Sequence, residues 1–252
     1  MLFEERLIYF PERRLWDSPA DHGLAYEEVV REARGGVQVF GWALLPGREA
    51  RAWLLYSHGN AGNISLRPAI VQPLVEMGYA ALLYDYRGYG RSGPGRPDEP
   101  GTYDDGEAML AEALRRAGHP RRVFLLGESL GGGVSYELAR RHPELGGLIT
   151  SSTFTSIPAM VRKLFPLPGL GALVRTRYDN LAKARELRPP RLLLHGRCDE
   201  LVPFRMAEEL RDATRPPAEL VAVDGAGHND LFDVGGDACY SAIARFVERH
   251  LP

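Results

Sequence analysis

The chain of 252 residues is poor in cysteine, in net charge and in long apolar runs. Its two cysteines, Cys198 and Cys239, are too few for a disulfide framework and belong to no clustered Cys/His pattern. They therefore predict no metal site, and we expect no cofactor. The net charge of −2 gives no electrostatic basis for binding nucleic acid. No apolar run approaches the ~18 residues that a membrane-spanning helix needs.

The start of the chain also lacks the pattern of a secretory signal. Residues Met1 to Arg6 are too few and too acidic for one. Two reduced thiols in a cytoplasmic protein are the favoured interpretation of the cysteines. We therefore expect a soluble protein in the cytoplasm.

Predicted strands and helices alternate along the chain. The first two strands, 26–33 and 37–45, flank Gly35-Gly36 and predict an antiparallel hairpin. Most later strands are uniformly apolar, which is typical of a parallel sheet covered on both faces. The sequence thus predicts an α/β fold with a mainly parallel sheet, whose later strands are 53–57, 79–84, 123–126, 145–150, 192–195 and 220–223.

Residues 151–190 interrupt this alternation within what we predict to be a single domain, 1–252. The segment is apolar but rich in proline, so it predicts short helices folded over the sheet as a lid. The prolines of the lid segment are Pro158, Pro166, Pro168, Pro189 and Pro190.

A second prediction concerns residues 94–101, which read as a Pro/Gly-rich loop before a helix over 104–117.

A buried strand runs into a glycine-rich motif at residues 123–133. Gly127-Glu128-Ser129-Leu130-Gly131 has the G-x-S-x-G pattern of a nucleophile on a tight strand-to-helix turn. Glycines flank such a turn because a Cβ there would collide with neighbouring backbone. Ser129 is therefore the predicted nucleophile, and a glycine-rich helix start without catalytic meaning is the alternative.

Two other loops follow strands at the same predicted edge of the sheet. Asp199 follows the strand 192–195, and His228 lies in a short Gly-rich loop after 220–223. Ser, then Asp, then His along the chain is the order that one class of serine hydrolases uses. Glu200 is the local rival for the acid, while Asp224 is interpreted as a turn residue. Asp230 is predicted to cap the final helix.

These residues have complementary chemical roles. We expect His228 to take the Ser129 proton and Asp199 to orient the imidazole. The backbone N–H groups of Leu130 and Asn60 are the predicted oxyanion hole.

A rival motif at residues 88–93 fits G-x-G-x-x-G. Prolines follow it where a nucleotide-binding fold would open a helix, so we expect no dinucleotide site.

Taken together, the motifs resemble the α/β-hydrolase superfamily, and within it the Bem46-like group of bacterial proteins and eukaryotic protein depalmitoylases. The resemblance implies an α/β-hydrolase fold with an eight-stranded sheet, the Ser129–Asp199–His228 triad and hydrolysis of esters or thioesters. It also implies loop-stabilising roles for His58, Asp85 and Arg87. The matching stretches are 7–11, 58–63, 85–90, 127–132, 178–180, 196–203 and 227–229.

Two features of that group are missing here. Many members begin with a hydrophobic membrane anchor, and this chain starts about where such an anchor would end. We therefore expect either a soluble form or membrane association through an anchor that this sequence lacks. The cysteine-rich lipidated start of the depalmitoylases is also absent, which weakens transfer of their activity.

Substrate and partners are less well defined by the sequence. A small-molecule or lipid-like ester is the expected partner, with its acyl chain against Phe154, Met160, Leu164 and Phe165 of the lid. Basic residues there favour a solvated face, with peripheral membrane contact through the lid or the N-terminus as the alternative. The other functions left open are a serine peptidase of prolyl-oligopeptidase type and a catalytically silent binding protein. The oligomeric state is not predicted.

Overall fold

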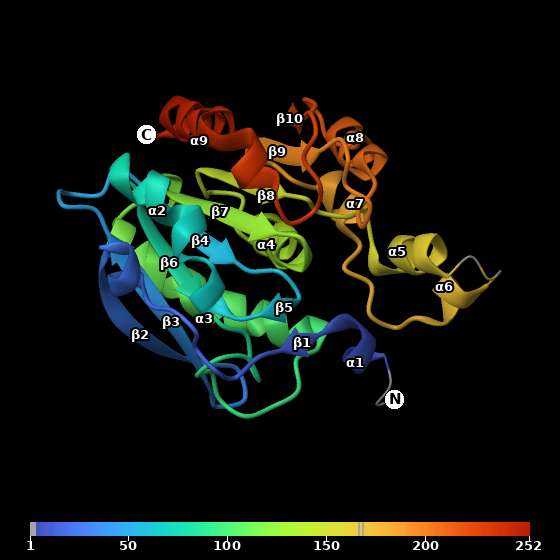
Figure 1. Cartoon of the computed structure of the whole chain (residues 1–252), viewed down its shortest axis with the longest axis horizontal. Coiled ribbons are helices and arrows are strands. Elements are labelled where there is room, and N and C mark those ends of the chain that lie inside the picture. The colour runs from blue at the N-terminus through green and yellow to red at the C-terminus, as the bar shows by residue number, and fades with distance from the viewer. Residues whose placement is uncertain (1–3, 166, 168) are drawn as a thin grey trace.

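The computed structural model describes residues 4–165, 167 and 169–252. The expectations that concern Met1 to Phe3, Pro166 and Pro168 lie outside these residues. The structure is built on a twisted eight-stranded sheet with the order β10-β9-β8-β7-β4-β6-β3-β2, shown in Figure 1. The strands are β2 (Ala25–Ala33), β3 (Val37–Leu45), β4 (Trp53–Ser57), β6 (Ala80–Tyr84), β7 (Val123–Glu128), β8 (Gly147–Ser151), β9 (Arg191–Gly196) and β10 (Glu219–Val223).

The direction of the strands follows the prediction. β2 and β3 pair antiparallel from Ala25↔Leu45 to Ala33↔Val37, and β3 pairs antiparallel with β6. The other neighbouring pairs, from β6 through β4 to β10, are all parallel. Gly35 and Gly36, in the turn 34–36 between the two strands, have φ of 82° and 77°, a left-handed region that glycine adopts readily. The mainly parallel sheet with an initial hairpin is therefore confirmed.

Helices cover both faces of the sheet (Figure 1). On one face α2 (Pro68–Glu76) and α9 (Leu231–His250) pack against the alternate strand residues that include Leu54, Leu126 and Leu194. On the other face lie α3 (Glu99–Ala117), α4 (Leu130–Arg141) and α8 (Phe204–Asp212). Because both faces are buried, the strands are apolar on both sides, as the sequence predicted.

One helix begins earlier than predicted. α3 starts at Glu99, so the predicted loop to residue 101 is wrong at its end. The Asp98 side chain accepts a hydrogen bond from the Gly101 N–H at 2.7 Å and caps the helix. Pro100 fits the first turn because its missing N–H needs no partner there. The proline that indicated a loop is in fact a helix-start residue.

The described residues of the segment 151–190 form three short helices, α5 (Ile157–Leu164), α6 (Leu170–Leu173) and α7 (Asn180–Ala184). α7 packs on α4, whereas α5 and α6 extend beyond the carboxyl ends of the strands (Figure 1). The Asn180 amide is fully buried and donates to the Phe154 carbonyl at 3.0 Å. Short helices are thus present, and their action as a lid stays a prediction.

The N-terminal segment reaches the same edge of the sheet. After α1 (Glu5–Ile8), β1 (Phe10–Pro11) pairs in parallel with β5 (Ala61–Gly62) to make a separate two-stranded sheet. The hydroxyls of Tyr9 and Tyr178 lie 2.9 Å apart, and Glu4 accepts hydrogen bonds from the backbone N–H groups of Arg175 and Thr176. This segment therefore connects the loop after β4 to the chain between α6 and α7. The remaining elements are the 3₁₀ turns Pro19–His22, Ile64–Leu66 and Pro120–Arg122.

Candidate active site

Ser129 stands on a sharp turn between β7 and α4. Its φ of 50° and ψ of −112° lie in a region that side-chain-bearing residues seldom adopt. The flanking glycines are required by space. A Cβ on Gly131 would lie 1.9 Å from the Ser57 carbonyl oxygen, and one on Gly127 would lie 2.6 Å from the Gly132 Cα. The pattern G-x-S-x-G therefore reflects the backbone of the turn itself.

The structure brings Ser129, His228 and Asp199 together from three loops at the carboxyl ends of β7, β10 and β9. His228 Nδ1 donates to Asp199 Oδ2 at 2.8 Å. Since an ionised carboxylate only accepts, Nδ1 carries the imidazole proton and Nε2 is free to accept. Ser129 Oγ lies 3.1 Å from that Nε2. The three side chains form one continuous hydrogen-bonded chain.

Asp199 is buried, and its charge is compensated by donors. Its Oδ1 accepts from the backbone N–H groups of Leu201 at 2.9 Å and Val202 at 2.7 Å. Burial alone would raise the pKa of Asp199, but hydrogen bonds from His195, His228 and the Val202 N–H lower it below its ordinary value. The carboxylate therefore stays ionised beside His228 at neutral pH.

The rival acids lie elsewhere. Glu200 is exposed, and Asp224 is exposed and pairs with Arg197 at 2.9 Å. Asp230 occupies the position before α9, but its side chain makes no hydrogen bond to the helix. It accepts instead from the Gly227 N–H at 2.6 Å, so the predicted cap is wrong. That bond holds the loop next to His228.

His195 was not predicted as a site residue. It lies in β9 next to Asp199. Its Nε2 donates to the Val202 carbonyl at 2.8 Å and lies 3.3 Å from Asp199 Oδ2. His195 thereby ties the two ends of the loop that carries Asp199. The available signal was its position four residues before Asp199, next to the end of a strand.

Asn60 and Leu130, the predicted oxyanion donors, both line the cavity onto which Ser129 opens. Within the part of the chain that the structure describes, neither backbone N–H donates to another protein group. The Asn60 side chain is used differently: Nδ2 donates to the Ile8 carbonyl at 2.9 Å. The Asn60 carbonyl accepts from the Phe10 N–H at 2.9 Å and the Tyr89 hydroxyl at 2.7 Å. The loop is thus fixed while both N–H groups remain available.

The cavity beside Ser129 has a volume of about 340 Å³ and is mainly apolar. We call it the acyl cavity, after the prediction that an acyl chain lies against four of its residues. It includes the four predicted substrate-binding residues, Phe154, Met160, Leu164 and Phe165. The other lining residues are Glu4, Leu7, Ile8, Asn60, Ser129, Leu130, Ile157, Val161, Leu170, Val174, Leu201 and Val202.

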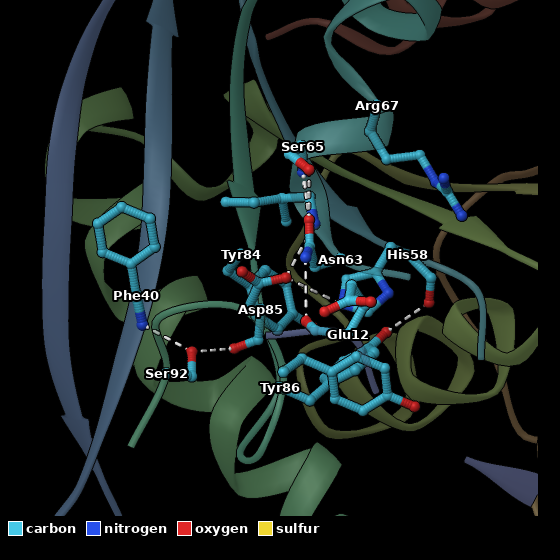
Figure 2. Close-up of polar contacts among 12 residues, drawn as sticks. Glu12, Phe40, His58, Asn63, Ser65, Arg67, Tyr84, Asp85, Tyr86 and Ser92 are labelled. Atoms are coloured by element: carbon cyan, nitrogen blue, oxygen red, sulfur yellow. Dashed lines mark hydrogen bonds and ion pairs between the residues drawn. The ribbon is translucent and has the colours of Figure 1, made fainter. Parts of the chain in front are cut away.

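Behind the Asn60 loop lies a buried polar cluster, shown in Figure 2. His58 and Asp85 are both fully buried, with Nε2 and Oδ1 3.5 Å apart. Burial raises the pKa of Asp85 to about 7 and lowers that of His58 to about 3, so burial favours the uncharged form of each side chain. Asp85 also accepts from the Ile64 N–H at 2.8 Å, and the Tyr86 hydroxyl donates to the His58 carbonyl at 2.9 Å. These contacts join the loops after β4 and β6.

The third residue for which the resemblance implies a loop role is Arg87. It donates to Asp105 through its backbone N–H and its guanidinium, each at 2.8 Å. Among the described residues, no group of three or more His, Cys, Asp or Glu side chains is placed to hold a metal ion. No helix in the same part of the chain is long and apolar enough to cross a bilayer.

Comparison with known proteins places this arrangement in a family. Residues 48–184 match the family described as serine aminopeptidase, S33, and residues 174–250 match that described as TAP-like protein. An uncharacterized protein of Mycobacterium tuberculosis is 34% identical over 247 residues, covering 97% of this chain and 87% of its own length. Protein bem46 of Schizosaccharomyces pombe is 31% identical over 223 residues, covering 80% and 71%.

Solved structures agree on the fold. The esterase Pf2001 of Pyrococcus furiosus superimposes with a TM-score of 0.81 at 20% identity, covering 97% of this chain and 99% of that one. A predicted CIB-like hydrolase from Thermoplasma acidophilum gives a TM-score of 0.64 at 20% identity, covering 90% and 100%. With relatives above 30% identity along most of its length, the chain belongs to the α/β-hydrolase superfamily as a Bem46-like protein.

Proposed function

We propose that this protein is a serine hydrolase that cleaves carboxylic esters or thioesters of apolar acyl groups through an acyl-enzyme. The observation that carries the proposal is the hydrogen-bonded chain from Ser129 through His228 to Asp199. The family and the esterase fold neighbours are consistent with this chemistry.

The first step is attack by Ser129 Oγ on the acyl carbon. His228 Nε2 takes the hydroxyl proton as the new C–O bond forms, and ionised Asp199 stabilises the resulting imidazolium. As the tetrahedral intermediate collapses, the bond to the leaving group breaks and His228 returns its proton to that group. Water then repeats the sequence on the acyl-enzyme and releases the carboxylic acid.

The negative charge of the tetrahedral intermediate needs donors on the acyl side. Among the described residues, the N–H groups of Asn60 and Leu130 have no protein partner, and both residues line the acyl cavity with Ser129. Leu130 is also the first residue of α4, whose N-terminus favours negative charge. Loss of one such donor typically costs about 3–4 kcal/mol of transition-state stabilisation. Because the donors are main-chain groups, the Asn60 side chain contributes to the oxyanion hole by holding the loop through its hydrogen bond to the Ile8 carbonyl.

The acyl cavity sets the class of acyl group. Of its 16 lining residues, 13 are apolar, and α5 and α6 supply many of them. An apolar acyl chain gains about 0.8 kcal/mol per methylene that it buries there. In this proposal residues 151–190 act as the lid over that chain.

The test is hydrolysis of p-nitrophenyl esters and acyl thioesters of increasing chain length by the purified full chain. We expect measurable turnover that rises with acyl length and falls at least ~1,000-fold in Ser129→Ala. Turnover by Ser129→Ala equal to that of the wild type, or no turnover of any ester or thioester, would contradict the proposal.

A peptidase is the second candidate, favoured by one observation. The family matched over residues 48–184 is described as a serine aminopeptidase. An aminoacyl p-nitroanilide assayed beside the esters separates the two functions. Faster turnover of the anilide than of any ester would make the protein a peptidase.

A further inference from the structure

A second cavity of about 300 Å³ lies next to His228, on the face of the sheet that α2 and α9 cover. It is formed by the ends of β7 and β8, the start of α2 and the start of α9. We call it the polar cavity. Its lining residues are Leu66, Arg67, Ile70, Glu128, Ser151, Ser152, His228, Asn229, Leu231, Phe232 and Asp233.

The two cavities divide the catalytic residues between them. Ser129 and both predicted oxyanion donors line the acyl cavity, whereas His228 lines the polar cavity. Their chemistry also differs: 13 of 16 lining residues are apolar in the first, and 7 of 11 are polar or charged in the second. The 3.1 Å contact between Ser129 Oγ and His228 Nε2 lies at the junction.

An ion pair forms the wall of the polar cavity nearest the nucleophile. Arg67 donates to Glu128 through Nε at 2.7 Å and Nη2 at 3.1 Å, and the Tyr56 hydroxyl donates to the same carboxylate at 2.6 Å. A Cβ built on Gly59 would lie 3.2 Å from Glu128 Oε1 and 3.7 Å from Ser129 Cβ. The carboxylate therefore borders the space between the Asn60 loop and Ser129. Arg67 Nη1 has no hydrogen-bond partner among the described residues.

Two serine hydroxyls of this cavity lack protein partners. Ser151 and Ser152 are each 2% exposed, and neither Oγ has a hydrogen-bond partner among the residues that the structure describes. Ser152 also has a left-handed φ of 49°. A buried hydroxyl without a partner costs about 1–3 kcal/mol, and both of these serines line the polar cavity, so a group with its own hydroxyls would be stabilised there.

We propose that the polar cavity binds the leaving-group alcohol of the substrate and selects a neutral alcohol that carries further hydroxyls. This inference rests on the proposed hydrolase function. The scissile oxygen must face His228 to receive its proton, so the alcohol extends toward the side that His228 lines, while the acyl chain occupies the other cavity. The hydroxyls of such an alcohol complete the hydrogen bonding of Ser151, Ser152 and Arg67.

The charges of the cavity indicate why the alcohol is neutral. Glu128 already neutralises Arg67, and Asp233 adds a negative charge at the rim. Among the described residues that line the cavity, no arginine or lysine is left unpaired to attract a phosphate or carboxylate on the leaving group. Hydroxyl groups need no such charge and accept and donate equally well.

The test compares 1-monohexanoylglycerol with propyl hexanoate, two esters with the same acyl chain and three-carbon alcohols that differ by two hydroxyls. We expect the wild type to favour the glycerol ester in kcat/KM by roughly tenfold or more. Ser151→Ala and Ser152→Ala should each reduce that ratio about two- to tenfold, the effect of one lost hydrogen bond. Ser135→Ala is the matched control, because Ser135 is fully buried with an unpartnered Oγ but lines neither cavity.

Each outcome separates the two proposals. A wild-type ratio near one, or a ratio that the double Ser151→Ala/Ser152→Ala variant leaves unchanged, overturns the leaving-group inference and leaves the hydrolase intact. No turnover of either ester or of p-nitrophenyl hexanoate overturns the proposed function itself. Thermal melting of each variant shows whether it is folded, so that a lost ratio is assigned to the cavity.

Discussion

At the scale of single residues, Asp199 and Asp85 show how position decides the behaviour of a carboxyl group. Both are buried at the carboxyl ends of strands, and burial raises the pKa of each. Asp199 receives hydrogen bonds from two histidines and two backbone N–H groups, and its pKa falls below the ordinary value. Asp85 receives too few donors, and its pKa rises to about 7. The first carboxyl group therefore stays ionised at neutral pH, whereas the second titrates near neutral pH.

Asp199→Asn is expected to lower kcat/KM for p-nitrophenyl esters by roughly 1,000- to 10,000-fold. The amide in place of the carboxylate no longer requires a proton on His228 Nδ1, so Nε2 loses its role as acceptor for Ser129. Asp224→Asn is the matched control, since Asp224 is exposed and pairs with Arg197. Equal losses in the two variants, or a small loss in Asp199→Asn, would contradict the assignment of the acid.

Asp85→Asn tests the buried pair with His58. The raised pKa means that the folded protein keeps a proton that the unfolded chain releases above its ordinary pKa, about 3.9. This group therefore makes the wild type less stable as pH rises from about 4 to 7, with no further change above that. The variant carries no titratable group at this position. The difference between its free energy of unfolding and that of the wild type should therefore grow in favour of the variant by about 2–4 kcal/mol across this window. Urea unfolding at a series of pH values measures the difference, and a difference independent of pH would sink the prediction.

At the scale of elements, regular strands were the most predictable part of the chain. The strands β3 and β4 have the predicted extents, and β2 begins one residue before its predicted start, because the apolar runs end at Gly, Pro or polar residues. The start of α3 was mispredicted because Pro100 suits a loop and a first helical turn equally, and only the Asp98 cap decides between them. The β1–β5 pairing could not be predicted, because two-residue strands carry no periodicity and their contact is long-range.

In the site, too, local patterns could be predicted from the sequence and long-range contacts could not. Ser129, Asp199 and His228, which the structure brings together, could be proposed from the sequence because each follows a predicted strand and their chain order is informative. Arg67 was not, because its role depends on the distance to Glu128, 61 positions along the chain, and no local pattern records that. Spatial pairs between distant elements are the information that the sequence alone did not supply.

The helix α5 gives a prediction about acyl length. Met160 is buried in the wall of the acyl cavity. Met160→Trp should fill part of it and lower the rate with p-nitrophenyl decanoate at least tenfold relative to the acetate, because longer chains lose their apolar contacts. Leu173→Trp is the control, since Leu173 is 77% exposed and does not line the cavity. A chain-length profile unchanged by Met160→Trp would place the acyl group elsewhere.

At the scale of the whole molecule, two glutamates joined to arginine clusters contribute stability that is lost in acid. Glu112 of α3 accepts hydrogen bonds from Arg115, Arg31 and Arg116, at 2.8, 2.6 and 2.6 Å. The bonds from Arg115, opposed by burial and reinforced by the other two arginines, lower the pKa of Glu112 to about 2. Arg31 lies in β2, so the cluster joins the hairpin to the helix layer.

A similar cluster surrounds Glu137 of α4. Burial raises its pKa, but hydrogen bonds from Arg140 and Arg141 prevail and lower it to about 2. A lowered pKa gives stability that is present above the unfolded value, about 4.3, and lost as pH falls toward 2. The double variant Glu112→Gln/Glu137→Gln should therefore show a flatter decline of unfolding free energy in this window, with Glu200→Gln as the exposed control. Parallel curves for the double variant and the wild type would contradict it.

The central claim is that Ser129 is a nucleophile activated by His228. A fluorophosphonate probe added to the purified chain tests it most directly, with the modified residue identified by peptide mass spectrometry. We predict one probe per chain, on Ser129, with labelling slowed at least ~1,000-fold in His228→Ala. No labelling, labelling of another residue, or an equal rate in His228→Ala would contradict it.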